Sequence, residues 1–342
     1  MIAIGFRRLM SLRRAPPSND RLVIWISLVP FPAGGLSPVA GRSQLSTLID
    51  VTREYREATM KIGMNTRVSS RSLDVAVVAQ KAEALGFESL WLPEHGVMPV
   101  HVTTRYQGSP DGRIPPSMSD MGDPFIGLAR ASTVTTTLKL GTGICLVPEH
   151  HPLLLAKEIA TLDHLANGRF LFGIGAGWLR EETEIMGGNF PHRWGQTREA
   201  IQVMKEIWTK DEAEFHGKFY DFPPVRSAPK PSRKPHPPIF LGGSAKNVFK
   251  RVVAWGDGWM PTRATPDDIK NARAALGELA AAAGRDPHSI EITVYGEASD
   301  PDMLKRFEDA GTDRVIVRLQ TTEGDAALAE LERMAEQLFS RV

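Results

Sequence analysis

Three groups of residues in this sequence could take part in chemistry, and each follows a short apolar run. The first is His95, which comes directly after Leu92-Pro93-Glu94. Imidazole titrates near neutral pH, so a histidine at the end of a strand is a candidate general acid or base. The alternative is a structural histidine that hydrogen-bonds to the backbone of the following loop.

The second group is a glycine-rich turn, Gly173-Ile174-Gly175-Ala176-Gly177, followed by Trp178. Its spacing differs from the G-x-G-x-x-G fingerprint of dinucleotide-binding folds. Because glycine has no Cβ, a flat ring or a phosphate could approach this backbone closely, so the turn is a candidate cofactor site. Tight packing at a corner of a sheet is the structural alternative.

The third group is Gly242-Gly243-Ser244, which precedes a helical pattern that we expect to start near Ala245. Free backbone amides at a helix N-terminus attract anions, particularly phosphate. The alternative is a plain turn in which Ser244 caps the helix. We predict a phosphate site here, because the two glycines add access to the backbone.

Other combinations of reactive residues lack the spacing that their chemistry needs. Glu149-His150-His151 looks metal-like, but the H-E-x-x-H spacing is absent, and we predict no metal site. The G-x-S-x-G motif of serine hydrolases does not occur. Cys145 is the one cysteine and lies in an apolar run. This excludes an internal disulfide and favours a small buried side chain over a reactive thiol.

Alternating strand and helix patterns would position these groups. Strand-like runs fall at residues 61–65, 89–92, 138–147, 169–174, 239–241, 258–260, 290–294 and 314–317. Helical patterns fall at residues 73–85, 124–136, 153–165, 194–208, 248–255, 267–283, 303–310 and 325–338. Eight strands that alternate with helices over about 280 residues predict a (β/α)8 TIM barrel, an α/β fold. A doubly wound sheet is the alternative, but Asn65-Thr66-Arg67 gives no glycine fingerprint after the first strand.

A proline-rich segment interrupts the alternation at residues 209–238, which contain seven prolines. This connection is long for a compact domain, so we predict a long insertion after the fourth-strand helix, acting as a lid or pocket wall. The charged residues Arg180, Glu181 and Glu182 open the segment after the fourth strand. We interpret them as partners of a helix dipole.

The composition excludes several classes of partner. The formal net charge is +1, which indicates neither a nucleic acid nor an anionic membrane as a partner. No run of 18 apolar residues occurs, so we expect no transmembrane helix. A single cysteine fits a reducing compartment, and we expect a cytoplasmic protein.

Residues 1–59 differ from the rest of the chain. No acidic residue occurs before Asp20, whereas four arginines do, and residues 22–31 are apolar. This resembles a poor signal peptide, because no clear cleavage site follows. We expect a non-structural or disordered extension over residues 1–59, with export as the alternative, and a barrel domain over residues 60–342.

An ordered series of motifs runs from about Met60 to Phe339. It consists of Ala84-Leu85-Gly86-Phe87-Glu88-Ser89-Leu90-Trp91, Glu94-His95, Leu140-Gly141-Thr142-Gly143-Ile144, Leu162-Asp163, Gly168-Arg169-Phe170, Gly173-x-Gly175-x-Gly177-Trp178, Arg193, Glu199, Trp208, Gly217-x-Phe219-Tyr220, Ile239-x-x-Gly242-Gly243 and Gly256-Asp257-Gly258-Trp259. Singly the motifs are modest. As a series they resemble the bacterial luciferase-like superfamily, which folds as a TIM barrel, and within it the oxidoreductases that use the deazaflavin coenzyme F-420.

The resemblance implies a catalytic residue and a support for the cofactor ring. His95 matches a strand-end histidine that faces the deazaflavin and is thought to handle the proton or charge during hydride transfer. Gly143–Ile144 matches a bond that is often a non-prolyl cis peptide, a bulge under the central ring.

The resemblance also implies contacts along the rest of the cofactor. Gly175, Ala176 and Gly177 would lie near the ring or its ribityl chain, with Trp178 beside them. The phosphate would be held by Gly242, Gly243, Ser244 and Thr262, and Arg263 would replace a phosphate-binding lysine that is absent nearby. A related sugar-phosphate dehydrogenase has a catalytic glutamate where this sequence has Trp178, so its substrate chemistry does not carry over.

Three functions follow from the resemblance. The first is an oxidoreductase that transfers hydride between F-420 and an unknown small organic substrate. The second is a monooxygenase that uses reduced FMN and O2, because both cofactors share a tricyclic ring, a ribityl chain and a phosphate. The third is a non-catalytic flavin-binding protein, since a fold does not prove a function. Members of the superfamily tend to form dimers, which leaves a homodimer open.

Overall fold

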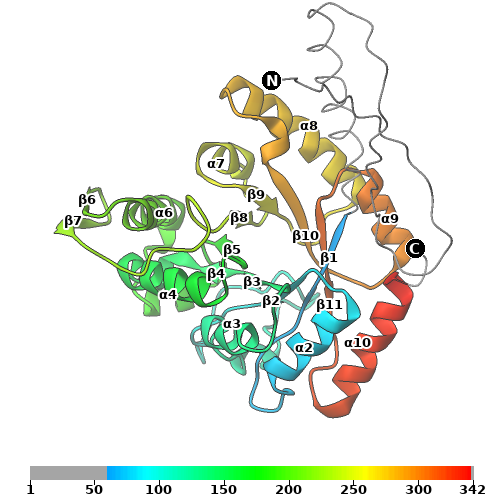
Figure 1. Cartoon of the computed structure of the whole chain (residues 1–342). Coiled ribbons are helices and arrows are strands. Elements are labelled where there is room, and N and C mark those ends of the chain that lie inside the picture. The colour runs from blue at the N-terminus through cyan, green and yellow to red at the C-terminus, as the bar shows by residue number, and fades with distance from the viewer. Residues whose placement is uncertain (1–59, 340–342) are drawn as a thin grey trace, which may run out of the picture. The chain divides into compact units, whose positions relative to one another are not determined.

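Residues 60–339 are described by a computed structural model and form a closed parallel barrel surrounded by helices (Figure 1). Strand β1 pairs with β2 on one side and with β11 on the other, and pairings of β3 and β4 with β5 close the ring. The predicted TIM barrel is therefore confirmed. Its strands are β1 (Lys61–Asn65), β2 (Ser89–Leu92), β3 (Lys139–Thr142) continued by β4 (Cys145–Leu146), β5 (Phe170–Gly175), β8 (Ile239–Gly242), β9 (Gly258–Met260), β10 (Glu291–Glu297) and β11 (Arg314–Arg318).

Helices follow the strands and cover the outside of the ring (Figure 1). Among residues 60–339, none of them combines the length and the apolar composition that crossing a bilayer requires. The helices are α2 (Val75–Leu85), α3 (Pro124–Ser132), α4 (Pro152–Leu165), α5 (Arg180–Ile185), α6 (Arg193–Thr209), α7 (Val248–Trp255), α8 (Pro266–Ala282), α9 (Pro301–Asp309) and α10 (Gly324–Phe339), with the single-turn 3₁₀ segments η1 (Pro116–Ser119), η2 (Val147–Glu149), η3 (Phe190–His192) and η4 (Pro287–Ser289).

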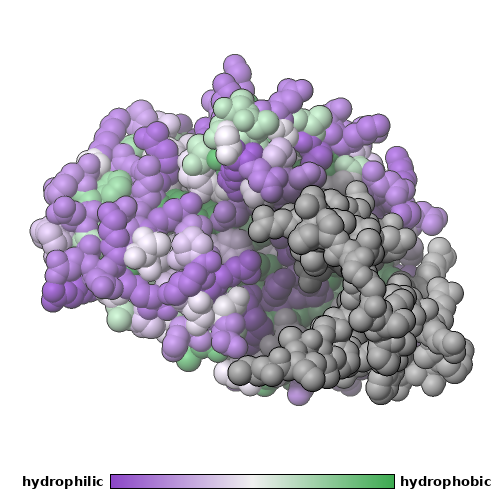
Figure 2. Space-filling model, turned by 45° about the horizontal axis from the view of Figure 1, so that its top comes forward, coloured by the Kyte–Doolittle hydropathy of each residue, from purple (hydrophilic) through white to green (hydrophobic). Residues whose placement is uncertain are grey.

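The strands alternate between two apolar cores, as a two-residue period requires. Within β2, Trp91 points into the barrel, whereas Leu90 and Leu92 pack under the helices. The barrel interior is filled by Trp91, Leu171, Phe240, Met260 and Ile316. On the face seen in Figure 2, the surface of the described residues is mostly hydrophilic, with small hydrophobic patches. Burial of these apolar side chains is the main stabilising contribution to the fold.

A buried arginine closes the amino-terminal end of the barrel. Arg314 opens β11, is 1% exposed and donates to both oxygens of Glu88 and to Glu291 at 2.9–3.1 Å. Glu88 directly precedes β2 and Glu291 opens β10, so one guanidinium ties β11 to its neighbour β10 and, past β1, to the start of β2. We therefore expect the active site at the opposite end, where the strands have their carboxyl ends.

Most predicted boundaries agree within two residues, and three expectations need correction. The third strand run is divided into β3 and β4 at Gly143–Ile144. Helix α3 ends at Ser132, four residues before the predicted end. Helix α7 begins at Val248, so Ser244 does not cap it. The acidic residues at 181–182, in contrast, lie in the first turn of a helix, α5, which agrees with their interpretation as helix-dipole partners.

The predicted insertion contains a hairpin of β6 (Ala213–His216) and β7 (Asp221–Val225), which lies against α6 outside the barrel (Figure 1). Two prolines inside β7 are tolerated because each strand of a two-stranded sheet has a free edge. The predictions for residues 1–59 lie outside the described residues.

Candidate active site

The floor of the barrel mouth is formed by the bulge between β3 and β4. The Gly143–Ile144 peptide bond is cis, and the Gly143 N–H donates to the Leu92 carbonyl oxygen at 2.8 Å. The Ile144 side chain extends over the ends of two further strands. A Cβ would lie 2.2 Å from Ile144 Cδ1 if added at Gly175 and 3.1 Å if added at Gly242. Four residues predicted from the sequence therefore meet around one side chain.

A polar pair, which was not predicted from the sequence, completes this floor. Asn65, at the end of β1, donates from Nδ2 to the Tyr295 hydroxyl at 2.9 Å. Asn65 is 8% exposed, and its Oδ1 is buried with no hydrogen-bond partner. Burial raises the pKa of Tyr295 to about 12, so the phenol keeps its proton at neutral pH. The unpaired amide oxygen can accept a hydrogen bond from an N–H group of a ligand.

His95 lies at the end of β2 and is held by a carboxylate rather than by the loop backbone. Its Nδ1 is 2.7 Å from Glu182 Oε2, and the two side chains are 9% and 1% exposed. An ionised carboxylate can only accept, so it favours a hydrogen on Nδ1. In residues 60–339, Nε2 has no hydrogen-bond partner. This nitrogen is therefore available to a substrate as a proton donor or acceptor.

An aromatic ring packs against this histidine, and a second ring packs against the first. Trp178 packs edge-on against His95, with 5.9 Å between ring centroids, and Tyr106 packs against Trp178 at 5.2 Å. Trp178 follows the Gly173–Gly177 turn, whereas Tyr106 belongs to the long loop after β2. The predicted site residues His95 and Trp178 therefore do meet, next to a tyrosine that was not predicted.

The long loop after β2, residues 93–122, is anchored to α5. Glu181 accepts from the backbone and hydroxyl groups of both Thr103 and Thr104 at 2.6–3.2 Å. Although desolvation opposes ionisation of Glu181, hydrogen bonds from Thr103, from the Thr104 hydroxyl and from its own backbone N–H lower its pKa to about 2. Arg263, beyond β9, donates to the Gln107 carbonyl oxygen at 2.6 Å. The loop is thus tied at two places and covers one side of the mouth.

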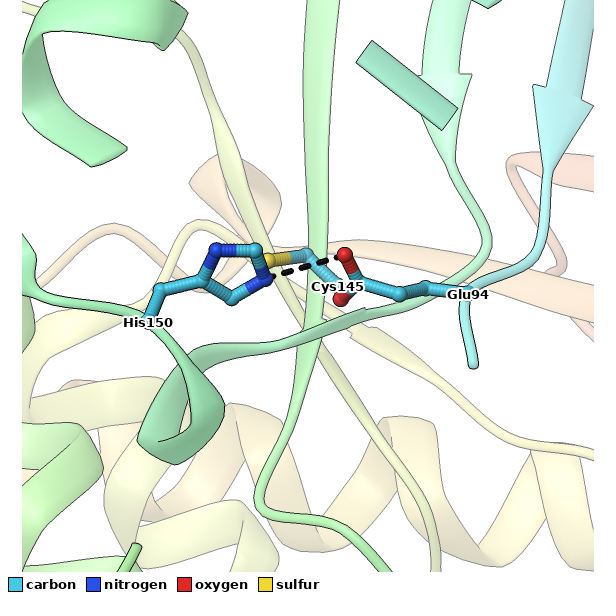
Figure 3. A group of neighbouring side chains, drawn as sticks. All are labelled: Glu94, Cys145 and His150. Carbon is cyan, nitrogen blue, oxygen red and sulfur yellow. Dashed lines mark hydrogen bonds and ion pairs between the residues drawn. The ribbon is translucent and has the colours of Figure 1, made fainter. Parts of the chain in front are cut away.

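Behind the strand ends, Glu94, Cys145 and His150 lie close together (Figure 3). The atoms with which these side chains could bind a metal ion lie within 4.8 Å of one another. Both carboxylate oxygens of Glu94 are engaged, one by His150 Nε2 at 2.9 Å and one by the Leu146 N–H at 2.5 Å. Burial, and then the charge of Glu94, raise the pKa of the Cys145 thiol, which agrees with the predicted buried, unreactive cysteine. The cluster links β2 to β4 by hydrogen bonds.

The predicted phosphate residues are placed differently from expectation. Gly243 has a positive φ of 89°, but its N–H already donates to the Met260 carbonyl oxygen. Ser244 and Thr262 are exposed, and Arg263 is engaged with the loop. Because α7 begins only at Val248, its free amides lie beyond Ser244. A phosphate role for these four residues stays a prediction.

Three arginines have unsatisfied donors at this end of the barrel: Arg67 just after β1, and a pair formed by Arg193 and Arg251. Arg193 begins α6 and Arg251 lies in the first turn of α7, and these helices follow β5 and β8. Arg193 Nε and Arg251 Nη1 are buried without hydrogen-bond partners. Burial, and then a neighbouring arginine in each case, lower both pKa values. Trp194 connects the pair, because Arg251 lies 4.3 Å above its ring.

This arrangement of like charges lacks a counter-ion in the described part of the chain. An anion such as a phosphate would satisfy the donors and relieve the repulsion. Arg193 is one of the motif residues of the sequence, although the motif assigns it no role. No sequence motif includes Arg251. The pair is the better-supported candidate anion site.

The chain belongs to the luciferase-like monooxygenase family, whose model matches residues 60–336. It is 36% identical over 288 residues to an uncharacterized protein of Mycobacterium tuberculosis, covering 82% of this chain and 99% of that protein. The structure superposes on the coenzyme F-420-dependent tetrahydromethanopterin reductase of Methanopyrus kandleri with a TM-score of 0.66 and 17% identity, over 82% of this chain and 99% of the other.

Two further relatives are enzymes with different activities. The FMNH2-dependent dimethylsulfone monooxygenase of Pseudomonas putida is 37% identical over 175 residues, which cover 46% of this chain and 48% of the enzyme. The F-420-dependent glucose-6-phosphate dehydrogenase of Amycolatopsis mediterranei is 25% identical over 274 residues, covering 78% and 77%. The family thus contains both F-420-dependent and FMN-dependent members, and its members are oxidoreductases or monooxygenases.

Proposed function

We propose that this protein is an oxidoreductase that transfers hydride between coenzyme F-420 and a small organic substrate, with His95 as the acid–base group. The observation that carries the proposal is the His95–Glu182 contact, which leaves Nε2 free at the barrel mouth. Hydride transfer to a carbonyl carbon or from an alcohol carbon needs a proton transfer at the neighbouring oxygen, and an oriented imidazole can supply it. The relative from Amycolatopsis mediterranei supports the choice of F-420.

The residues at the mouth fit a ring cofactor with a phosphate-bearing tail. Ile144 offers a flat apolar support where Gly175 and Gly242 leave room for it. The unpaired Oδ1 of Asn65 could accept from a ring N–H, and the unsatisfied donors of Arg193 and Arg251 would bind a phosphate. When bound, the reduced deazaflavin supplies the hydride. The same features fit FMN, since the two cofactors share these parts.

The chain's own residues would orient the substrate, move its proton and exclude water. Glu182 keeps the His95 ring in place, so that Nε2 can give a proton to a substrate oxygen or remove one. Trp178, which packs against the His95 ring, and Tyr106, which packs against Trp178, would form an aromatic wall next to the substrate. The loop that Glu181 anchors would shield the reaction from solvent.

A monooxygenase that uses reduced FMN and O2 is the second candidate. The observation that favours it is the 37% identity to the Pseudomonas putida monooxygenase over about half of this chain. In that case His95 would supply a proton to a reduced-oxygen species, and the same wall and loop would protect it from water.

Calorimetric titration of the full chain with F-420 and with FMN, each oxidised and reduced, distinguishes the two candidates. We expect micromolar binding of F-420 and much weaker binding of FMN. Turnover is then followed by the loss of F-420 absorbance with a panel of alcohols and carbonyl compounds. Preference for reduced FMN with oxygen consumption would establish the second candidate, and binding of neither cofactor would contradict both.

The role of His95 is tested by the His95→Asn variant. We expect kcat to fall by about 10²- to 10⁴-fold, the usual contribution of a positioned acid–base group, while cofactor affinity changes little. His164→Asn is the matched control, because His164 is an exposed residue in the last turn of α4. Unchanged turnover in His95→Asn would remove His95 from the mechanism.

A further inference from the structure

Three buried carboxylates lie behind the reactive end of His95, and only two of them have an imidazole partner. Glu94, Glu149 and Glu182 are 8%, 7% and 0% exposed, and they follow β2, β4 and β5 respectively. Glu94 pairs with His150 at 2.9 Å and Glu182 pairs with His95 at 2.7 Å. Glu149, in contrast, forms no ion pair with a basic side chain in residues 60–339.

Glu149 is held instead by a hydroxyl group. Thr183 Oγ1 donates to Glu149 Oε1 at 3.0 Å. Thr183 follows Glu182 in α5, so consecutive residues of one helix contact His95 and Glu149. The contact also depends on Gly177, where an added Cβ would lie 2.7 Å from Thr183 Oγ1 and 3.3 Å from Glu149 Oε1.

Glu149 keeps its proton at neutral pH. Burial, and then the negative charges of Glu182 and Glu94, raise its pKa to about 8, whereas the Thr183 hydrogen bond and His150 act in the opposite direction. Two ionised carboxylates on neighbouring elements would repel each other in this dry region. A proton on Glu149 removes this repulsion and leaves Glu182 as the anion that faces His95.

We propose that Glu182 and Glu149 act as a pair of positioning residues behind His95. Glu182 fixes His95 with its hydrogen on Nδ1 and its Nε2 free, and Glu149, which is hydrogen-bonded to the next residue of the same helix, is the neutral partner of that carboxylate. The catalytic meaning of this pair rests on the proposed function, in which His95 moves a proton. The structural pair itself does not depend on the proposed function, because the His95–Glu182 and Thr183–Glu149 contacts form within the chain without any ligand.

Nitrogen-15 NMR of the histidine side chains tests the pair on the full-length protein without any cofactor. The His95 signals are assigned as those absent from His95→Asn. In wild type we expect the neutral His95 ring to carry its hydrogen on Nδ1, and its shifts to show a second inflection near pH 8 as Glu149 ionises. A neutral ring with its hydrogen on Nε2, or a titration without that inflection, would overturn the proposal.

Two isosteric variants separate the two roles. Glu182→Gln should mix the two His95 tautomers, because glutamine can donate as well as accept where the carboxylate can only accept. Glu149→Gln should leave the hydrogen of the neutral His95 ring on Nδ1 and remove the inflection near pH 8, because glutamine imitates the protonated acid. Unchanged His95 spectra in Glu182→Gln, or an inflection that persists in Glu149→Gln, would contradict the respective role.

Glu158→Gln is the matched control. Glu158 is a partly buried carboxylate on α4 whose charge acts on His150, so its loss should leave the His95 signals in place. In turnover, Glu182→Gln should lower kcat with little change in KM. If the NMR results are as expected but His95→Asn retains turnover, the pair is real and the proposed function is wrong.

Discussion

At the scale of single residues, the most constrained feature of the mouth is Ile144. Its Cδ1 occupies space that a side chain on either Gly175 or Gly242 would need. The side chain is only partly buried and packs on the inner core of the barrel, so its upper surface faces the mouth. Any displacement of Ile144 therefore changes the surface that a ring cofactor would contact.

The Gly175→Ala variant tests this support. The new Cβ would lie 2.2 Å from Ile144 Cδ1, which must move toward the mouth. Overpacking of this kind typically costs 1–3 kcal/mol, so we expect cofactor binding to weaken by about tenfold or more in calorimetric titration. Gly277→Ala is the control, because this α8 glycine has open space around it and the change should stabilise the helix by about 0.5–1 kcal/mol. Equal cofactor affinities in the two variants would contradict the role of Ile144.

Residue types and spacing predicted part of this site. His95 and the glycine turn stand at strand ends, where a barrel positions its chemistry, so a periodic sequence pattern locates them. Glu182 could not be assigned in this way, because it is 87 positions from His95 and lies in an acidic run that also suits a helix start. Arg251 was missed for a related reason: a lysine- and arginine-rich helix face is usually solvated, and only the tertiary structure shows an unpaired buried guanidinium.

At the scale of elements, α5 has more roles than its length suggests. Consecutive residues of this short helix contact the loop after β2, the ring of His95 and the carboxyl group of Glu149, through Glu181, Glu182 and Thr183. A helix of six residues has little stability of its own, so these side-chain contacts must help to hold it. Movement of the loop and orientation of His95 are therefore coupled through α5.

Loss of the loop anchor is tested by Glu181→Ala. Four hydrogen bonds to Thr103 and Thr104 disappear, so the loop should open more often. We expect cleavage by trypsin at Arg105 and Arg113 to accelerate about fivefold or more, and KM to rise together with a lower kcat. Glu184→Ala, which removes an exposed partner of Arg180 on the same helix, should change neither. Equal cleavage rates in both variants would show that Glu181 does not anchor the loop.

The order of elements followed from the sequence, because each barrel strand is a short apolar run between amphipathic helices. The exceptions have physical causes. The third run is continuous in hydrophobicity but divided at Gly143–Ile144, where the chain makes a bulge at the mouth. The prolines at 223–224 indicate a loop, yet they fit a two-stranded hairpin with free edges. Helix α5 is too short to produce a clear period.

At the scale of the whole barrel, the two ends have opposite electrostatic characters. At the amino-terminal end, Arg314 compensates Glu88 and Glu291 and the network is satisfied. At the carboxyl end, three buried carboxylates follow β2, β4 and β5, and buried donors of Arg193 and Arg251 have no partner in residues 60–339. The amino-terminal end therefore contributes stability. The carboxyl end keeps charged groups that are available to bind ligands and to transfer protons.

The stabilising end is tested by Arg314→Met. Removal of the guanidinium leaves Glu88 and Glu291 without their buried partner, so we expect the free energy of unfolding in urea to fall by about 3–5 kcal/mol. Lys61→Met, which removes the half-exposed partner of Glu291, should cost less than about 1 kcal/mol. Equal losses would show that burial of the pair does not matter.

The same substitution should alter acid stability. Burial opposes ionisation of Glu88, but Arg314 and then Lys139 lower its pKa from 4.5 to about 2. A lowered pKa contributes stability that is present above pH 4.5 and is lost as the pH falls toward 2. The stability difference between wild type and Arg314→Met should therefore shrink in that range.

Glu149 at the opposite end should have the reverse pH dependence. Its pKa is raised from 4.5 to about 8, so below pH 4.5 the folded and unfolded states are both protonated and no penalty exists. Between pH 4.5 and 8 the unfolded chain loses this proton while the folded chain retains it, and stability falls by at most about 5 kcal/mol. Above pH 8 both states are ionised and the penalty is constant.

Glu149→Gln removes this penalty, because glutamine does not titrate. Relative to wild type, we expect the variant to gain unfolding free energy progressively from pH 5 to 8 and to keep that gain at pH 9, measured by urea denaturation at each pH. Glu184→Gln, an exposed change on α5, should give a small difference that does not depend on pH. A pH-independent difference for Glu149→Gln would mean that Glu149 is ionised in the folded protein, and His95 would then face two negative charges instead of one.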